Sequence, residues 1–436
     1  MRRIVLAALL VITVNLAARA DLMQYVARAD PTYAWKKVQD GQIDGLTYAD
    51  LRMTSQTWHD IEWKHRLVIV RPESAAHATQ AVLVIAGGSW HEGQEPPPVD
   101  EKSREFQMAK TIANAARCPV AFILQIPFQP IFDGKVEDQI ISYTFEQYIK
   151  TGDEDWPLLF PMAKAAVRAM DTVQAYADKE WQLKIKDFVV CGASKRGWTT
   201  WLTGAIDPRV KAIAPMVIDT LNMPAQMKHQ VETWGTYSEQ IGDYTRAGIQ
   251  GMMDTPAGQK LTALVDPYSY RRKLTMPKLL IMGTNDRYWP LDALNIYWPD
   301  LEGEKYVLYI PNVGHDLKDP LRLLSDISAW SLKAAGQLKF PRLSWDLAEK
   351  DSGLELKVRS DVKPVSVSLW TAESDTRDFR PVKWKSRELN ATGDEFVGVL
   401  DRPQSGFSAA FGEAYYQLDG HPLYLSTNVR IIEAKK

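Results

Sequence analysis

Short apolar runs recur along the first three quarters of the chain, and most are followed by a turn and a helical pattern. They occupy residues 63–71, 81–85, 119–126, 188–190, 210–218, 277–282 and 305–310. Runs of this kind are typical of strands buried within a sheet. Residues 102–116, 160–179 and 320–338 carry apolar positions at helical spacing. This alternation predicts a mostly parallel sheet with helices on its faces.

Two later stretches break this rhythm. Residues 220–272 contain no clear strand and are expected to be helical, either as a lid over a site or as a subdomain without a gating role. Past residue 340, short alternating strands separated by turns predict a small antiparallel β-sandwich. We therefore expect an α/β domain over 21–339, interrupted by the 220–272 insertion, and a sandwich domain over 340–436. Residues 21–60 are interpreted as an arm packed against the core.

The first twenty residues have the pattern of a secretory signal peptide. Arg2 and Arg3 precede an apolar run, and Ala18-Arg19-Ala20 fits a cleavage site. The apolar run is shorter than the ~20 residues that span a bilayer comfortably, although an uncleaved anchor is the alternative. We expect a mature chain from Asp21, located in the periplasm or secreted, with no other membrane-spanning segment.

Composition narrows the function. The net charge is -2, whereas a nucleic-acid binder would need a basic surplus, so no nucleic-acid partner is expected. The two cysteines, Cys118 and Cys191, stand at opposite ends of predicted parallel strands, which places them too far apart for a disulfide. We expect two buried free thiols, and neither a cofactor nor a metal.

Candidate chemistry begins at residues 188–201, where a buried strand runs into a tight turn and then a helix. Ser194 lies in the turn, flanked by Gly192 and Gly197. A serine at such a sharp turn is lifted above the sheet as a nucleophile. The spacing is G-x-S-x-x-G rather than the usual G-x-S-x-G, because Arg196 holds the second small position. The alternative is a serine that merely occupies a tight turn.

Two further residues follow late strands. Asp286 comes just after the run 277–282, and His315 follows the run 305–310. Asp286 could orient a histidine, or it could only N-cap a helix starting near residue 291. Asp219, after the preceding strand, is the fallback acid. The chain order Ser194, Asp286, His315 is that of the α/β-hydrolase fold.

The remaining candidate site residues surround this triad. The backbone N–H groups of Lys195 and of Gly88 or Ser89 are expected to form an oxyanion hole, because Gly88 and Ser89 follow the strand 81–85. A plain turn is the alternative for that glycine segment. We expect Trp90, Arg196 and Trp289 to contact substrate. Positive charge from Lys195 and Arg196 would favour an anionic substrate.

Five stretches resemble the PhoPQ-activated pathogenicity-related proteins of bacteria, which also resemble a secreted proliferation repressor of social amoebae. They are residues 150–174, 192–223, 266–289, 311–315 and 369–380, including GASKRGW and PNVGH. The resemblance implies an α/β-hydrolase-like, exported protein linked to virulence regulation by PhoP/PhoQ, without a defined substrate. The elbow is also similar to that of glucuronoyl esterases, where the Lys195 position helps hold the oxyanion.

Two classes of function fit these observations. The first is a serine hydrolase that cleaves an ester acyl bond of a small molecule, peptide or glycan, with peptidase activity as the rival. The second is an enzyme-like binding or signalling protein of the cell envelope, since a fold does not determine a function. The geometry of Ser194, His315 and Asp286 discriminates between them.

Overall fold

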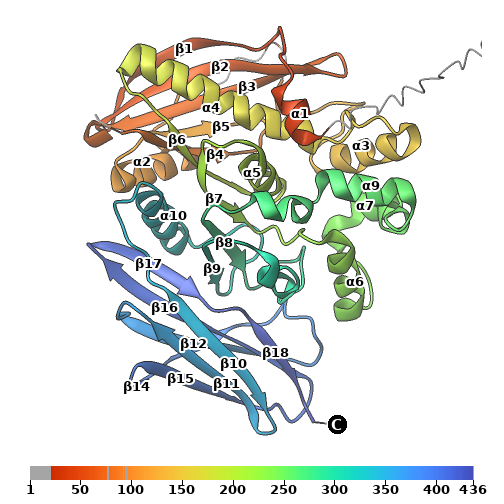
Figure 1. The fold of residues 1–436 in the computed structure, drawn as a ribbon, viewed down its shortest axis with the longest axis vertical. Helices are drawn as coiled ribbons and strands as arrows, with labels where there is room; N and C mark the ends of the chain where they lie inside the picture. Colours follow the sequence, from red (N-terminus) through yellow and green to blue (C-terminus); the bar gives the residue numbers. More distant parts are fainter. Residues whose placement is uncertain (1–20, 76–77, 92, 94–96, 436) are drawn as a thin grey trace, which may run out of the picture.

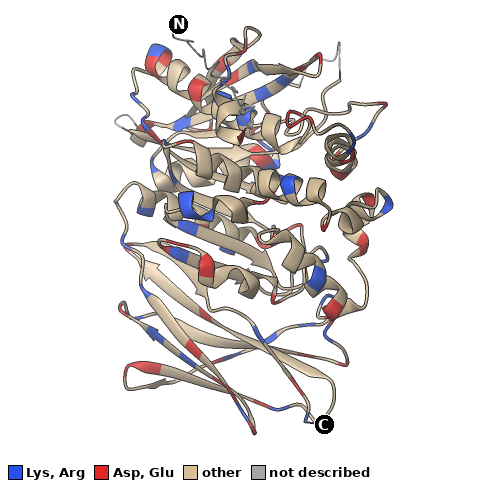
Figure 2. Ribbon diagram, turned by 45° about the vertical axis from the view of Figure 1, so that its right-hand side comes forward, with Lys and Arg blue, Asp and Glu red and all other residues tan. Residues whose placement is uncertain are grey.

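The computed structural model describes residues 21–75, 78–91, 93 and 97–435, so the predicted signal peptide lies outside the described residues. Figure 1 shows a twisted sheet with helices on both faces, a helical insertion at one side and a β-sandwich below. No helix in the described part is long and apolar enough to cross a membrane. Lys and Arg are interspersed with Asp and Glu throughout the ribbon (Figure 2).

The central sheet has nine strands in the order β1-β2-β3-β5-β4-β6-β7-β8-β9. Strands β5, β4, β6, β7, β8 and β9 are parallel, as predicted, and β3 joins β5 antiparallel. The bounds are β1 Ala34–Ile43, β2 Leu46–Trp58, β3 Ile61–Pro72, β4 Gln80–Ile85, β5 Val120–Ile123, β6 Asp187–Ala193, β7 Val210–Met216, β8 Lys278–Gly283 and β9 Lys305–Ile310.

The interpretation of residues 21–60 as an arm was wrong, because β1 and β2 extend the sheet. Asp44 and Gly45 both have positive φ, 52° and 77°, in the two-residue turn between these strands. His59 and Asp60 form a similar turn into β3, with φ 46° and 61°. Such turns match the twist of an antiparallel hairpin, and Asp-Gly is a strong signal for one. Only the short helix α1, Leu22–Ala27, packs as an arm on the core.

Helices cover both faces of this sheet. The buried side chains of α4 (Leu159–Trp181) and α5 (Lys195–Ile206) pack on the face that carries Phe188 and Val190. The helices α2 (Arg104–Ala116) and α10 (Pro320–Ala334) pack on the opposite face, with Val189 and Cys191. Alternate residues of β6 are therefore buried on opposite faces. Both cysteines are free and buried, as predicted.

Residues 220–272, called here the helical insertion, contain no strand. The elements are α6 Met223–Trp234, η2 Glu239–Ile241, α7 Gly242–Arg246, α8 Ile249–Met252, α9 Pro256–Val265 and η3 Pro267–Lys273. They lie beside α3 (Asp138–Thr151), which contacts α7, α8 and α9. The remaining short 3-10 helices are η1 Glu73–Ala75, η4 Ala293–Ile296 and η5 Trp298–Asp300.

The C-terminal strands form the predicted antiparallel sandwich. Its sheets have the orders β10-β11-β15-β14 and β13-β12-β16-β17, with β18 also paired to β16. The bounds are β10 Leu343–Lys350, β11 Gly353–Ser360, β12 Ser366–Ser374, β13 Lys385–Glu388, β14 Ala391–Thr392, β15 Glu395–Asp401, β16 Phe407–Leu418, β17 His421–Ser426 and β18 Arg430–Glu433.

The sandwich is attached to the α/β domain through α10 and β9. The Arg322 guanidinium of α10 donates two hydrogen bonds to the Glu413 carboxylate, at 2.9 and 3.0 Å. The backbone N–H of Tyr424 donates to Asp326, also on α10, at 2.8 Å. The two parts share a continuous apolar core, which includes Leu354, Leu356, Ile327 and Trp330. The sandwich is therefore packed as one body with the α/β domain.

Candidate active site

Ser194 lies in strained backbone at the junction of β6 and α5. Its φ and ψ are 59° and −131°, a region that residues with a side chain rarely occupy. Its N–H donates to the Met216 carbonyl at 2.9 Å, which holds the turn against β7. Strained geometry of this kind presents the hydroxyl above the edge of the sheet.

The two flanking glycines have separate packing reasons. A Cβ at Gly192 would lie 2.7 Å from the Arg196 carbonyl oxygen, and one at Gly197 would lie 2.7 Å from the Ile218 side chain. The turn therefore closes only without side chains at these positions. The G-x-S-x-x-G spacing suits this turn because Gly197 faces β7, whereas the Arg196 side chain points away under Gly87.

Asp286 and His315 meet as predicted from their positions after β8 and β9. The His315 Nδ1 atom lies 2.9 and 3.1 Å from the two carboxylate oxygens of Asp286. Asp286 also accepts the Tyr288 N–H at 2.8 Å, which fixes the carboxylate within its turn. No α-helix starts near residue 291; the short helix η4 begins after Asp292. The N-cap interpretation of Asp286 was therefore wrong.

Asp219, the fallback acid, has a different partner. The Tyr297 hydroxyl donates to its carboxylate at 2.5 Å. Burial raises the pKa of Asp219 to about 7, against the hydrogen bond from Tyr297, and the charge of Asp286 adds to the rise. The histidine of the site is thus bonded to Asp286, and Asp219 is a buried neighbour.

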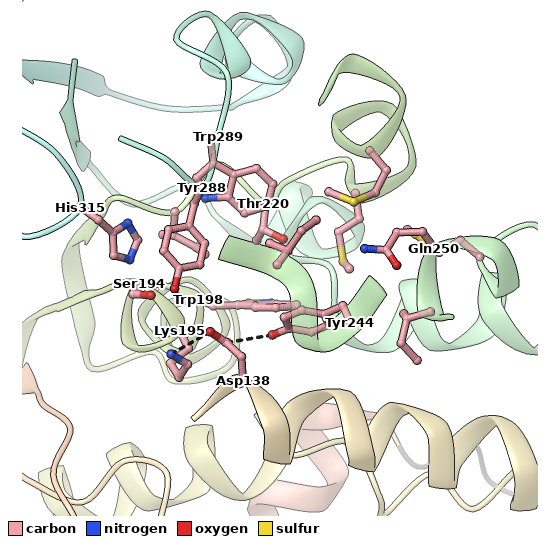
Figure 3. Close-up of a pocket in the computed structure, with 16 residues that line it drawn as sticks. Asp138, Ser194, Lys195, Trp198, Thr220, Tyr244, Gln250, Tyr288, Trp289 and His315 are labelled. Carbon is pink, nitrogen blue, oxygen red and sulfur yellow. Dashed lines mark hydrogen bonds and ion pairs between the residues drawn. The ribbon is translucent and has the colours of Figure 1, made fainter. Parts of the chain in front are cut away.

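The other ring nitrogen of His315 faces the serine side of the site. Nε2 is buried and has no hydrogen-bond partner among the described residues, Ser194 included. The Tyr288 ring stacks on His315 with 4.1 Å between centroids and a 27° interplanar angle. Figure 3 shows Ser194, Tyr288 and His315 together at one end of a cavity that all three line. Hydrogen bonds between catalytic groups are often long without substrate.

The predicted oxyanion donors come after two neighbouring strands of the sheet, Lys195 after β6 and Gly88 and Ser89 after β4. Lys195 is the first residue of α5, so its backbone N–H has no partner within the helix. Gly88 and Ser89 follow β4, whose Ile85 is level with Gly192 of β6. Gly88 has φ 116°, which favours glycine, and both residues are exposed. Their role in binding an oxyanion stays a prediction.

The expected positive charge beside the serine is neutralised. The Lys195 Nζ atom lies 2.8 Å from Glu137 and 3.3 Å from Asp138. Arg196 donates to the other Glu137 oxygen at 2.6 Å. Burial alone would raise the pKa of Glu137, but its bond to Arg196 and the charges of Arg196 and Lys195 lower it to about 2. The interpretation of these cations as a site for an anion was wrong.

The cavity at Ser194 is narrow, about 60 Å³, and mainly apolar. Helix α5 contributes Trp198, the turn after β8 contributes Trp289, and the helical insertion supplies much of the remaining wall. Lining residues from the insertion are Thr220, Met223, Met227, Ile241, Tyr244, Ile249, Gln250 and Met253. Asp138 stands at its edge, bonded to Lys195 and Tyr244 (Figure 3).

The predicted contact residues divide between this cavity and other places. Trp289 lines it, but Arg196 is held below the elbow by Glu137. Trp90 lies in a separate hollow beside Trp35, because the chain after β4 turns toward β1 and β2. Sequence reasoning missed Tyr288, although it stands two residues after Asp286. It also missed Asp138 and the methionines of the insertion, which have no local motif.

Comparison with known proteins shows the family of this chain. The family model of the PhoPQ-activated pathogenicity-related proteins matches residues 22–380. The chain belongs to this family. Autocrine proliferation repressor protein A of Dictyostelium discoideum is 32% identical over 431 residues, covering 91% of this chain and 85% of that protein. The family match thus spans Ser194, Asp286 and His315, the helical insertion and part of the sandwich.

The solved structures that this chain matches in part include esterases. An acetyl xylan esterase from Paenibacillus sp. R4 matches with 14% identity and a TM-score of 0.48, over 67% of this chain and 86% of that one. Acetyl Xylan Esterase 1 from Thermoanaerobacterium sp. matches with 14% identity and a TM-score of 0.44, over 72% and 94%. The α/β-hydrolase fold of this family member follows from its own parallel sheet, serine turn and chain order.

Proposed function

We propose that this family member is a serine hydrolase that cleaves a carboxylic ester with a small, uncharged acyl group. The main support is the hydrogen bond between His315 and Asp286, because Ser194, in its strained turn, and His315 line the same cavity. A nucleophile, a base and a group that orients the base are the parts that acyl transfer requires.

The chemistry follows from these positions. The Ser194 oxygen attacks the ester carbonyl while His315 Nε2 takes the hydroxyl proton, and Asp286 stabilises the imidazolium. The Lys195 N–H, with that of Gly88 or Ser89, holds the oxyanion. Collapse breaks the ester bond, and His315 returns the proton to the leaving alcohol. Water then attacks the acyl-enzyme with His315 again as the base, releasing the acid and restoring Ser194.

The cavity wall supports a small apolar acyl group. One water needs roughly 10–15 Å³ of such volume, so about 60 Å³ holds only a few small groups. Most of its lining is aromatic, aliphatic or methionine side chains, and the cation that lines it, Lys195, is already paired with Glu137 and Asp138. A carboxylate would therefore find no unpaired Lys or Arg among the described residues of this wall. Ester cleavage is favoured over peptide cleavage because a compact acyl pocket suits a short acid better than a residue within a chain.

Acyl preference can be measured with p-nitrophenyl esters. We expect kcat/KM for the acetate or propionate to exceed that for the hemisuccinate at least about tenfold, because an unpaired charge is costly in an apolar cavity. The octanoate should also be poor, and Met253→Ala should raise its rate relative to the acetate by widening the cavity. A preference for the hemisuccinate would contradict the assignment of an uncharged acyl group.

Labelling by a fluorophosphonate probe tests the mechanism directly. The wild-type chain should be labelled, and Ser194→Ala should lose the label while keeping the same circular dichroism spectrum and melting temperature. Ser89→Ala is the matched control and should keep the label, because a backbone N–H rather than the Ser89 hydroxyl is assigned a role. A folded wild-type chain that resists the probe would favour a binding or signalling function, as the name of the Dictyostelium relative suggests.

The setting of this activity is also a proposal. The family name connects its members with PhoPQ activation and pathogenicity, and we infer that this hydrolase acts in the same context. Export to the periplasm or the exterior is supported by the charged and apolar pattern of residues 1–20.

A further inference from the structure

A loop of the sandwich domain reaches the back of the candidate active site. Residues 375–384 connect β12 to β13 and are called here the brace loop. Phe379 and Trp384 in this loop are each only 2% exposed and belong to the same core cluster as α4 and α5. The brace loop is thus built into the α/β domain, although the chain places it in the sandwich.

The brace loop is bonded to the residue before the acid of the triad. The Asn285 side-chain amide donates to the carbonyls of Val382 at 2.7 Å, Arg380 at 3.1 Å and Phe379 at 3.4 Å. Asn285 directly precedes Asp286, and its backbone N–H donates to the Val313 carbonyl at 3.0 Å. The side chain of Asn285 therefore connects the brace loop to the turn after β8 that carries Asp286, called here the acid turn. The backbone of Asn285 connects it to the turn after β9 that carries His315, called here the histidine turn.

The histidine turn has its own connection. The Asn312 side chain donates to the Trp384 carbonyl at 3.1 Å and accepts the Trp384 N–H at 2.8 Å. Asn312 lies three residues before His315, and its backbone N–H donates to the Thr284 hydroxyl at 2.9 Å. The turns that carry Asp286 and His315 are thus both hydrogen-bonded to the brace loop, one through the Asn285 side chain and the other through the Asn312 side chain.

The same loop also contacts the helical insertion. Arg380 makes an ion pair with Glu239 of η2 at 2.9 Å, and its guanidinium lies 4.1 Å from the centroid of the Trp234 ring at the end of α6. Arg377 lies 3.0 Å from Asp292, which is bonded to His229 of α6. The brace loop therefore holds the acid turn, the histidine turn and one wall-forming segment of the cavity.

We propose that the sandwich domain is a working part of the active site, and that Asn285 and Asn312 are positioning residues through which the brace loop aligns Asp286 with His315. Loops move more than strands, and the triad needs its acid–histidine bond held within a fraction of an ångström. The proposal rests on the proposed hydrolase function for its kinetic consequence, but the alignment itself can be observed without substrate.

The test compares Asn285→Ala with Asn295→Ala in the full chain. Asn295 is a matched control because its amide also donates to the sandwich, at the Val429 carbonyl at 2.9 Å, but it adjoins neither triad turn. The first readout is the downfield proton NMR signal of the His315 Nδ1–H, assigned by its loss in His315→Ala. The second is ester hydrolysis, split into kcat and KM, with melting temperatures recorded for both variants.

We expect Asn285→Ala to shift or abolish the His315 signal and to lower kcat about tenfold to a hundredfold with little change in KM, as misplacement of a catalytic group does. Asn295→Ala should keep the signal and a kcat within about twofold of wild type at a comparable loss of melting temperature. A wild-type chain without the signal, or an Asn285→Ala chain that keeps it unshifted, overturns the proposal. A shifted signal in a chain that hydrolyses no ester supports the positioning role and instead refutes the proposed function.

Discussion

Replacing Asp286 with asparagine should lower kcat for ester hydrolysis by about four orders of magnitude, the size of this effect in serine proteases. The carboxylate accepts the Nδ1 proton of His315 at 2.9 Å, which leaves Nε2 free to accept the proton of Ser194. An asparagine amide can donate to Nδ1 and so favours the tautomer with the proton on Nε2. That tautomer cannot act as the base.

The fold should survive this substitution, because the carbonyl oxygen of the new amide can still accept the Tyr288 N–H, which Asp286 now accepts at 2.8 Å. KM should change much less than kcat, since Asp286 does not line the cavity. Steady-state rates with p-nitrophenyl acetate measure both quantities. Fluorophosphonate labelling of Asp286→Asn should slow in parallel, because the same base activates Ser194.

Asp219→Asn is the matched control for the acid. Asp219 also follows a sheet strand, but it is bonded to Tyr297 rather than to His315. Its replacement should leave kcat within a few fold of wild type, because an asparagine oxygen can still accept the Tyr297 hydroxyl. If Asp219→Asn were as slow as Asp286→Asn, Asp219 rather than Asp286 would be the working acid, contrary to the geometry of the site.

The proximity of the proposed triad residues could be predicted from sequence because each of them follows a buried apolar run. Ser194, Asp286 and His315 lie one, three and five residues past the ends of β6, β8 and β9. The carboxyl ends of parallel strands meet at one edge of a sheet. The local sequence pattern at each of these three positions therefore predicts that the three residues lie close together, although they are far apart in the chain. The same argument placed Asp219 nearby, and only the side-chain contacts separate the two acids.

The electrostatics of the site could not be predicted in this way. Lys195 and Arg196 carry charge in the sequence, but Glu137 and Asp138 neutralise them from the start of α3, more than fifty residues earlier. No periodicity or spacing links these segments. The contacts of the brace loop were hidden for the same reason, since Asn285 finds its partners in Phe379, Arg380 and Val382 across two domains.

The N-terminal strands were missed for a different reason. No residue of β1 is fully buried, so no apolar stripe indicates this strand, and its pairing with β2 depends on the turn. Asp44-Gly45 is a hairpin signal that could have been used. Trp90 was misplaced because it lies beyond a strand end, where the direction of the following segment depends on tertiary packing.

Glu137→Ala should destabilise the chain by about 2 kcal/mol near neutral pH and should also lower activity. The substitution leaves Arg196 without its 2.6 Å partner and Lys195 without its 2.8 Å partner, both in poorly exposed positions. Removal of one member of a buried pair costs more than the pair contributes, because the remaining charge is unpaired. The estimate is modest because 35% of the Glu137 side chain is exposed and Asp138 still contacts Lys195.

The lowered pKa of Glu137 determines how this loss of stability changes with pH. The folded-state pKa of Glu137 is lowered from 4.5 to about 2, so the carboxylate stabilises the fold above pH 4.5 and loses that contribution as the pH falls toward 2. The difference in unfolding free energy between wild type and Glu137→Ala should therefore be largest above pH 5 and shrink below pH 4. Urea unfolding at several pH values measures this difference. Glu146→Ala is the control, because the Glu146 side chain is 34% exposed, about as much as that of Glu137, but its partner Lys150 is 58% exposed. A difference that stays constant across this range would mean that packing, rather than charge on Lys195 and Arg196, holds the base of the serine turn.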